Sequence, residues 1–530
     1  MSSPPIPPAE TTSHTLGSPR FDVIVIGSGN AGSSAALSAI DNGCKQVLLI
    51  DKCPPEWVGG NSYFTAGAYR TVHDGLTDIL EIIPNVDPEF AATIDMEPYT
   101  NKQFTEDITR LSNGRSNPAL VEALVDGSHD TILWLSKRIK IPFTLSFHRQ
   151  AYLIDGRQKF WGGMVLAIEG RGKGLVSAHH RALKESGIKV YFNTEATDLV
   201  LSNGRVSGLK VKRGDEVLML EATAIILASG GFESSREMRH KYLGSEWVNA
   251  RVRGTPHNTG ETLLMAQRAG AAFQGDWGGC HSTCWDANTS TDAGDRVLSN
   301  QFTKSGYPLG IMVNADGHRF VDEGEDFRNY TYAKFGREIL EQKGGYAFQI
   351  YDAKVTPWLR KEEYADDVVE KVVAQTIGEL AEKLSRKGLE NPNRFLETLQ
   401  DFNEAVCSFT NLHPEKAWDP AVKDGLSTGS SLEIPKSNWA QTIEQPPFVA
   451  VKVATGVTFT FGGLSIDPNT AGVISSENGA PIIGLFAARE IVGGLFYSNY
   501  PGGSGLTSGA VFGGKAGKAA AALSYANANI

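Results

Sequence analysis

Short apolar runs that end at glycine or at a charged residue open the regular part of the chain. Residues 21–27 read Phe-Asp-Val-Ile-Val-Ile-Gly, a run rich in β-branched residues that is typical of a buried strand. Residues 30–42 carry small Ala and Ser side chains in a helical pattern, and residues 46–51 form a second apolar run. A strand, a helix and a strand within about thirty residues predict a βαβ unit, with parallel strands and a right-handed crossover.

A helical pattern and then strand patterns follow in the next part of the chain. Residues 118–140 repeat apolar positions at helical spacing and predict a helix packed on the sheet. Apolar and polar residues alternate over 189–192, 205–213 and 216–229. This alternation predicts an antiparallel layer that leads into a buried strand.

A change of character marks a second domain. Residues 362–388 and 393–409 have long, charged helical patterns. Glycine-rich strands resume at Phe448, and a final helix starts near Gly503. The order predicts a discontinuous α/β domain interrupted by an α+β domain.

A chain of 530 residues exceeds what one hydrophobic core usually fills, so two or more domains are expected. We predict a first domain in two parts, 21–283 and 442–530, and an inserted domain over 284–441. Residues 1–20 hold four prolines in the first eight positions and are predicted to be a disordered tail.

Charge and composition exclude several classes of protein. Lys plus Arg number 50 and Asp plus Glu number 60, a net charge of −10, so no positive field exists for a nucleic acid and none is predicted as a partner. Apolar runs stay below the roughly 18 residues that span a bilayer, which predicts no integral membrane segment. Five scattered cysteines indicate a reducing compartment, and we expect the cytoplasm.

Glycine and cysteine positions bear on cofactors. The 57 glycines exceed the usual share of about 7% and indicate turns where the backbone approaches a ligand closely. Cys280, His281 and Cys284 lack a second Cys or His pair at ligand spacing, so no metal site is predicted.

A glycine motif stands between the first predicted strand and helix. Gly27-Ser28-Gly29-Asn30-Ala31-Gly32 has the spacing G-x-G-x-x-G. Its glycines make the turn, admit a diphosphate and let helix and strand close together, and the helix N-terminus faces the diphosphate. Asp51 follows the second strand, where a carboxylate accepts hydrogen bonds from an adenosine ribose. The motif predicts FAD or NAD without distinguishing them.

Five motifs in order along the chain resemble the fumarate reductase and succinate dehydrogenase flavoprotein family. They are the glycine motif and residues 59–68, 226–232, 258–261, and 485–490 with 502–507. Residues 59–68, 319–337 and 496–513 are most similar to tricarballylate dehydrogenase-like members of that family. The resemblance covers nearly the whole chain. It implies a Rossmann-like FAD-binding α/β domain, with a parallel sheet and an antiparallel layer, and an inserted α+β capping domain that closes over the flavin.

The resemblance implies non-covalent FAD, because no histidine stands at or near Asn61 and Ser62, where succinate dehydrogenases attach the flavin. Glu490 is expected to hold the ribityl chain. The amides around Gly505 and Leu506 are expected to face the pyrimidine end of the ring, where a helix N-terminus stabilises the anionic reduced flavin. The motif and the resemblance together predict these cofactor-binding residues: Gly27, Gly29, Asn30, Ala31, Gly32, Asp51, Lys52, Gly60, Asn61, Ser62, Thr65, Gly67, Ala196, Ser229, Gly230, Glu490, Gly505 and Leu506.

Part of the family's catalytic set has a match. Fumarate reductases bind a dicarboxylate with two histidines and an arginine, and move the proton with another arginine fed by a Glu–Arg relay. His281 matches the first histidine, and Arg328 matches the proton-transferring arginine if one extra residue is allowed. Phe459 and Tyr500 replace the second histidine and the substrate-binding arginine. Fumarate reduction by that route is not expected.

Neutral Thr303 and Gly306 stand where the relay pair belongs. Hydride removal from an unactivated carbon requires the neighbouring carbon to lose a proton. We predict that Arg328 binds a carboxylate or carbonyl oxygen and assists proton transfer, His281 is a second binding group, and Tyr500 orients or deprotonates the substrate. Each also has a structural alternative, namely a solvated ion pair, a core histidine and a packing tyrosine.

The predicted activity is FAD-dependent dehydrogenation, or reduction, of a CH–CH bond next to a carboxylate or carbonyl, with hydride exchanged at flavin N5. Tricarballylate-like substrates are favoured. A larger, less charged substrate, as in ketosteroid dehydrogenases, stays open, as does a non-redox flavoprotein. The sequence has no haem-attachment motif and no cysteine cluster for iron–sulfur centres, so the electron acceptor is open among oxygen, a quinone and a protein.

Overall fold

The computed structural model describes residues 20–528 except 84 and 421. The predicted disordered tail therefore lies outside the described residues, apart from Arg20, which begins β1 (Arg20–Ile26). The chain divides into two compact units. Unit 1 holds the described parts of 1–238, 255–279 and 459–530, and unit 2 holds 239–254 and 280–458.

These boundaries differ from the predicted ones at 284 and 441. Residues 239–254 fall in unit 2, where β12 (Arg251–Val252) pairs with Gly456 and Val457 of β17 (Phe448–Leu464). Strands β13 (Phe273–Asp286) and β17 each continue from one unit into the other.

Unit 1 is built on a mixed sheet with a parallel centre. The central strands are β8 (Lys189–Tyr191), β2 (Val47–Ile50), β1, β11 (Glu216–Leu227) and β19 (Pro481–Ala487), each parallel to the next. Strands β9 (Glu195–Ser202) and β10 (Arg205–Arg213) add an antiparallel layer, and β18 (Gly472–Ile474) pairs antiparallel with β19. Because residues 23–26 of β1 and all of β2 are buried Val, Ile and Leu, helices can cover both faces. The α/β class with both kinds of layer is confirmed.

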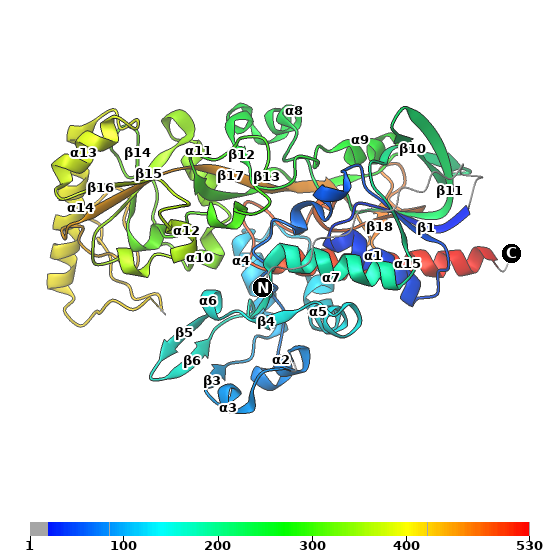
Figure 1. Ribbon diagram of the computed structural model, residues 1–530, viewed down its shortest axis with the longest axis horizontal. Coiled ribbons are helices and arrows are strands. Elements are labelled where there is room, and N and C mark those ends of the chain that lie inside the picture. Colours follow the sequence, from blue (N-terminus) through cyan, green and yellow to red (C-terminus); the bar gives the residue numbers. More distant parts are fainter. Residues whose placement is uncertain (1–19, 84, 421, 529–530) are drawn as a thin grey trace. The chain divides into compact units, whose positions relative to one another are not determined.

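Two helices of unit 1 touch along their backbones. Helix α1 (Asn30–Asp41) follows β1, and α15 (Ser504–Ala528) runs beside it, blue and red in Figure 1. A Cβ atom at Gly513 would lie 2.5 Å from the Ala31 carbonyl oxygen, so this face of α15 has no room for side chains. Helices α5 (Pro118–Trp134) and α7 (Arg171–Glu185) pack on α15 and α1 respectively.

The remaining elements of unit 1 are shorter. They are α2 (Leu76–Ile82), α3 (Pro88–Ala91), β3 (Ile94–Met96), α4 (Asn101–Leu111), β4 (Phe143–Leu145), α6 (Phe147–Gln150), β5 (Ala151–Ile154), β6 (Arg157–Phe160), β7 (Leu166–Ile168), α8 (Arg236–Met238) and α9 (Glu261–Arg268). Across residues 20–83, 85–420 and 422–528, no helix is both long and apolar enough to cross a bilayer.

Unit 2 contains a sheet with side chains packed on both faces. Strands β12, β17, β15 (Ala347–Tyr351) and β14 (Ile311–Asn314) lie in this order, and β13 and β16 (Lys371–Ala374) also pair with β17. Ile311 and Val313 pack in a core with α13 (Ile377–Ser385) and α14 (Pro392–Leu412), whereas Met312 packs in a second core with α11 (Phe335–Leu340). This alternation follows from the two-residue period of a strand.

The prediction of a helix over 362–388 is wrong in its middle. Helix α12 (Lys361–Tyr364) ends early, and Lys371–Ala374 forms β16, which pairs with Val449 and Val451 of β17. β-Branched residues beside a strand partner override helical spacing. The helix predicted over 393–409 is confirmed as α14, which starts at Pro392 with an Asn391 cap.

Candidate functional site

A cavity opens in unit 1 where β1, β2 and β11 end. Its wall includes the glycine turn at Gly27 to Gly29, the segment Asp51 to Cys53 and the turn Ala228 to Gly230. The carboxyl ends of parallel strands are where open α/β sheets bind ligands. The predicted dinucleotide site is therefore a real hollow.

Backbone geometry shapes the glycine turn. Gly27 has φ +109°, a conformation that L side chains rarely adopt. Ser28 donates to Asp51 Oδ2 from its amide at 2.8 Å and from its hydroxyl at 2.6 Å. Asp51 Oδ1 accepts from the Cys53 amide at 3.0 Å. Asp51 thus fastens the turn and keeps lone pairs for hydroxyl donors.

The predicted cofactor residues fall into three groups. Those that line the first cavity are Gly27, Gly29, Asp51, Lys52, Gly60, Asn61, Ala196, Ser229 and Gly230. Those that line a second cavity, with about 310 Å³ of empty space, are Glu490 and Gly505. Those outside both linings are Asn30, Ala31, Gly32, Ser62, Thr65, Gly67 and Leu506.

Asn30 illustrates the third group. Its side chain is buried and accepts a hydrogen bond from Tyr69 Oη at 2.8 Å, lies 3.0 Å from His179 Nε2, and donates to the Leu506 carbonyl at 2.9 Å. The Asn30 amide donates to Ser62 Oγ at 2.9 Å. These two side chains join α1 to its neighbours and hold the site's framework.

Several lining residues carried no signal in the sequence. Thr194 and Glu195 follow β8 without a motif. Asn258 and Glu261 belong to the motif at 258–261, which does not indicate their contacts: Glu261 accepts a hydrogen bond from Lys52 Nζ at 2.7 Å. Arg489 lines both cavities. Its neighbour Glu490 was the predicted residue.

The walls of the two cavities fit FAD. The first offers glycine-rich backbone and the Asp51 carboxylate, which suit a diphosphate and a ribose. At the second, Glu490 Oε2 and Thr460 Oγ1 are buried without a hydrogen-bond partner in the described part of the chain. Unpartnered buried oxygens are costly unless a ligand supplies hydrogen bonds, and the hydroxyl groups of FAD can do so.

In unit 2, Arg328 begins α10 (Arg328–Thr331) and contacts a buried carboxylate. Arg328 Nη1 donates to Ser305 Oγ at 2.8 Å and lies 3.8 Å from Glu363 Oε1. Glu363 is buried and accepts from the Ser305 amide at 3.0 Å and from its hydroxyl. Arg360 Nη1 lies 3.5 Å from Glu363 Oε1. Neither Ser305 nor Glu363 had been predicted, because they come from separate segments.

Neighbouring positive charges determine the protonation state of Glu363. Burial raises the pKa of Glu363, but Arg360, Arg328 and the Ser305 hydrogen bonds outweigh it, and the net shift is below the ordinary value. Glu363 is therefore an anion between two cations. The three side chains keep one net positive charge, which favours an anionic ligand.

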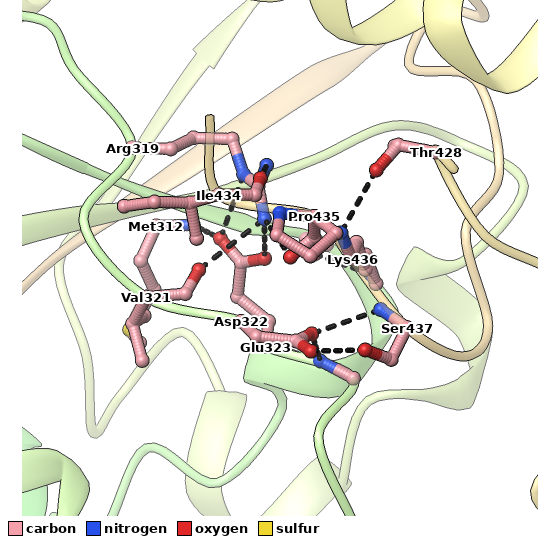
Figure 2. Close-up of polar contacts among 12 residues, drawn as sticks. Met312, Arg319, Val321, Asp322, Glu323, Thr428, Ile434, Pro435, Lys436 and Ser437 are labelled. Atoms are coloured by element: carbon pink, nitrogen blue, oxygen red, sulfur yellow. Dashed lines mark hydrogen bonds and ion pairs between the residues drawn. The ribbon is translucent and has the colours of Figure 1, made fainter. Parts of the chain in front are cut away.

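The segment before Arg328 is held by a separate polar network. Figure 2 shows Arg319 facing Glu323, with Nη2 2.5 Å from Oε2, and Asp322 facing Ser437. Arg319 Nη1 also donates to the Ile434 carbonyl at 2.7 Å. These contacts tie residues 319–323 to residues 434–437. The charged side chains of residues 319–323 therefore have a structural role.

His281 is buried in unit 2, with its ring edge-on to Tyr332 at a centroid distance of 5.0 Å. Burial, with a smaller effect from Arg253, lowers the pKa of His281 well below its ordinary value. The imidazole is neutral at pH 7, so it can serve as a hydrogen-bonding group and not as a cationic one.

Tyr500 belongs to an aromatic cluster in unit 1. Its ring centroid lies 5.1 Å from Phe459, 6.2 Å from Phe461 and 5.2 Å from Phe496, and all four side chains are buried. Both positions that replace the family's charged groups, 459 and 500, thus lie in an aromatic cluster.

Comparison with known proteins adds the family. The family model described as "FAD binding domain" matches residues 22–506. NADH:fumarate oxidoreductase of Klebsiella pneumoniae (strain 342) is 28% identical over 515 residues, 94% of this chain and 48% of that protein. The chain thus spans about half of that relative. Probable fumarate reductase Ifc3 of Shewanella frigidimarina (strain NCIMB 400) is 27% identical over 518 residues, 97% of this chain and 75% of that protein.

A solved structure shows the same fold. The 3-ketosteroid Δ1-dehydrogenase of Sterolibacterium denitrificans in complex with 1,4-androstadiene-3,17-dione has a TM-score of 0.72 at 20% identity, covering 95% of this chain and 99% of that one. The predictions of family, fold and FAD are confirmed, while closeness to tricarballylate dehydrogenases and non-covalent attachment of FAD stay predictions. The chain belongs to the FAD-binding family of fumarate reductase and succinate dehydrogenase flavoproteins.

Proposed function

We propose that this protein dehydrogenates a CH–CH bond next to a carboxylate or carbonyl, or reduces the corresponding double bond, and that Arg328 binds the activating oxygen. The observation that carries the proposal is the half-buried guanidinium of Arg328, whose Nη1 is held by Ser305 and Glu363. Its Nε and Nη2 donors suit a carboxylate or carbonyl oxygen. FAD, when bound, supplies the hydride acceptor or donor.

Each of the three predicted residues is given a role that fits its surroundings. Arg328 stabilises negative charge on the substrate oxygen as the α-proton leaves or arrives. His281, being neutral, binds a second substrate oxygen through one N–H. Tyr500 orients the substrate, because a phenol in an aromatic cluster combines packing with one hydroxyl.

Two substrate classes differ in how much charge they need neutralised. Tricarballylate-like substrates carry three carboxylates, whereas the cluster around Tyr500 has the apolar side chains Phe459, Phe461 and Phe496. The resemblance favours the first class. The aromatic cluster supports the second, a larger molecule with one carboxylate or carbonyl and an apolar body.

Anaerobic titration of the yellow holoprotein separates these classes. Tricarballylate, succinate and a 3-ketosteroid are each added, and flavin bleaching is followed with an artificial acceptor for turnover. Bleaching by tricarballylate supports the first class, and bleaching by the steroid alone supports the second. A protein that photoreduces normally but is bleached by no CH–CH substrate and reoxidised by no unsaturated one is a non-redox flavoprotein, which contradicts the proposal.

The role of Arg328 has a matched test. Arg328→Gln is expected to lower kcat/KM roughly 100-fold to 1,000-fold, as loss of an oxyanion-stabilising donor does. Arg386→Gln makes the same change at a side chain 74% exposed and should leave kcat/KM near wild type. Equal activities in the two variants would remove Arg328 from the mechanism.

A further inference from the structure

Two buried glutamates meet in unit 1. Glu233 is completely buried and Glu490 is 4% exposed. Glu233 follows β11, Glu490 follows β19, and these strands are parallel neighbours. Both turns therefore leave the sheet at the same edge.

The hydrogen bonds around the pair leave one oxygen of each carboxylate without a partner among the described residues. Glu233 Oε1 accepts from Asn61 Nδ2 at 2.6 Å and from Asn258 Nδ2 at 2.7 Å, and Glu490 Oε1 accepts from the Thr460 amide at 3.1 Å. Both Oε2 atoms are buried, and no donor among the described residues reaches them. Because Glu233 and Glu490 are both buried and interact electrostatically, ionisation of both at once is disfavoured.

The effects of the neighbouring groups on the two pKa values are consistent with one proton shared by the pair. Burial, and next the Glu233 carboxylate, raise the pKa of Glu490 well above its ordinary value, while Arg489 acts the other way. Burial also raises the pKa of Glu233, while the neighbouring Glu490 and the Asn258 and Asn61 amides act the other way. Arg489 is the cation that acts on Glu490.

The pair lies where the two cavity walls meet. Asn61 and Asn258 line the first cavity, Glu490 lines the second and Arg489 lines both. A Cβ atom at Gly231 would lie 2.5 Å from Glu490 Oε1. The bare backbone at Gly231 is what lets Glu490 reach Glu233.

We infer that Glu233 and Glu490 hold one proton between them, and that Glu233 is a positioning residue that keeps Glu490 neutral toward the hydroxyl chain of FAD. A neutral carboxyl group both donates and accepts hydrogen bonds, as a hydroxyl chain requires. Loss of the proton adds a second negative charge in a site that receives an anionic diphosphate. FAD binding is therefore linked to this proton.

FAD affinity of the apoprotein tests the inference without any substrate, so its outcome does not depend on the reaction proposed above. Dissociation constants are measured by flavin fluorescence between about pH 6 and about pH 9.5. The wild type should lose affinity as the pH rises through the raised pKa of the pair, approaching tenfold per pH unit. Glu490→Gln, which is neutral at all pH values, should change less than about twofold.

Glu233→Gln gives the directional test. Without the neighbouring carboxylate, Glu490 loses its proton more easily, so affinity should begin to fall at a lower pH than in the wild type. Glu382→Gln, at a side chain 70% exposed, should follow the wild type. Identical pH profiles in the wild type, Glu233→Gln and Glu490→Gln would overturn the inference.

Urea unfolding of the apoprotein provides a readout free of FAD. Because the folded pKa of Glu490 is raised, the folded state binds more protons above the unfolded value of about 4.3. The stability of the wild type should thus fall as pH rises, up to tenfold per pH unit in the unfolding equilibrium, relative to Glu490→Gln. Parallel profiles would contradict a proton held in the folded pair.

Discussion

Replacement of Gly32 by alanine tests how closely α1 must approach the glycine turn. The new Cβ atom would lie 1.9 Å from the Gly27 carbonyl oxygen, whereas real Cβ contacts stay above 3.0 Å. The helix or the turn must therefore move by at least 1.1 Å, the difference between those distances. Helices α15 and α7 pack on α1 and restrict this movement. Overpacking of this kind costs about 1–3 kcal/mol, and we expect about 3 kcal/mol, with FAD affinity lowered at least roughly tenfold because the turn is displaced.

Gly514→Ala is the matched control. It makes the same change inside α15, where no atom lies within 4 Å of the added Cβ. Here alanine should stabilise the protein by about 0.5–1 kcal/mol, because glycine is the poorer helix former. Urea unfolding of the apoproteins and FAD titration measure both effects. If Gly32→Ala unfolds no earlier than Gly514→Ala and binds FAD like the wild type, the close approach of α1 does not shape the turn.

Three further predictions concern single side chains. Burial lowers the pKa of His179 to about 3, so below about pH 6.5 the unfolded chain binds the extra proton and the free energy of unfolding falls by up to about 1.4 kcal/mol per pH unit. His179→Gln should lessen this slope in urea unfolding at several pH values, and equal slopes would refute a neutral buried imidazole. Glu323→Gln removes the carboxylate from a buried Arg319 and should cost about 3 kcal/mol in thermal unfolding; a loss below about 0.5 kcal/mol would show that the pair is not structural. Glu363→Gln should lower kcat/KM roughly tenfold through misplacement of Arg328 while flavin content stays unchanged, and wild-type kinetics would contradict that role.

The first part of the fold was predictable because its signals are local. The run 21–27, the glycine motif and Asp51 lie within about thirty residues, and each constrains the backbone by sterics or by a nearby hydrogen bond. A βαβ unit then has one favoured handedness. The structure has β1, α1 and β2 close to the predicted bounds.

Contacts between distant segments were not predictable from the pattern alone. The strand β16 stands inside a helical pattern, and only its pairing with β17 makes it a strand. Likewise Glu233 follows the noticed Ser229–Gly231 turn, yet nothing in that motif indicates a partner as far away as Glu490. Such partners depend on which strands lie side by side, and this information is spread over the whole chain.

Loss of a residue type at an aligned position is weak evidence for loss of its chemistry. Thr303 and Gly306 are neutral where the family has charged groups, which argued against an acid beside Arg328. In the structure Ser305, between those two positions, hydrogen-bonds Glu363 from α12, and that carboxylate lies 3.8 Å from Arg328. A second arginine, Arg360, lies 3.5 Å from the same oxygen of Glu363. The charge is therefore present beside Arg328, supplied by another element, and an argument from aligned positions alone had to miss it.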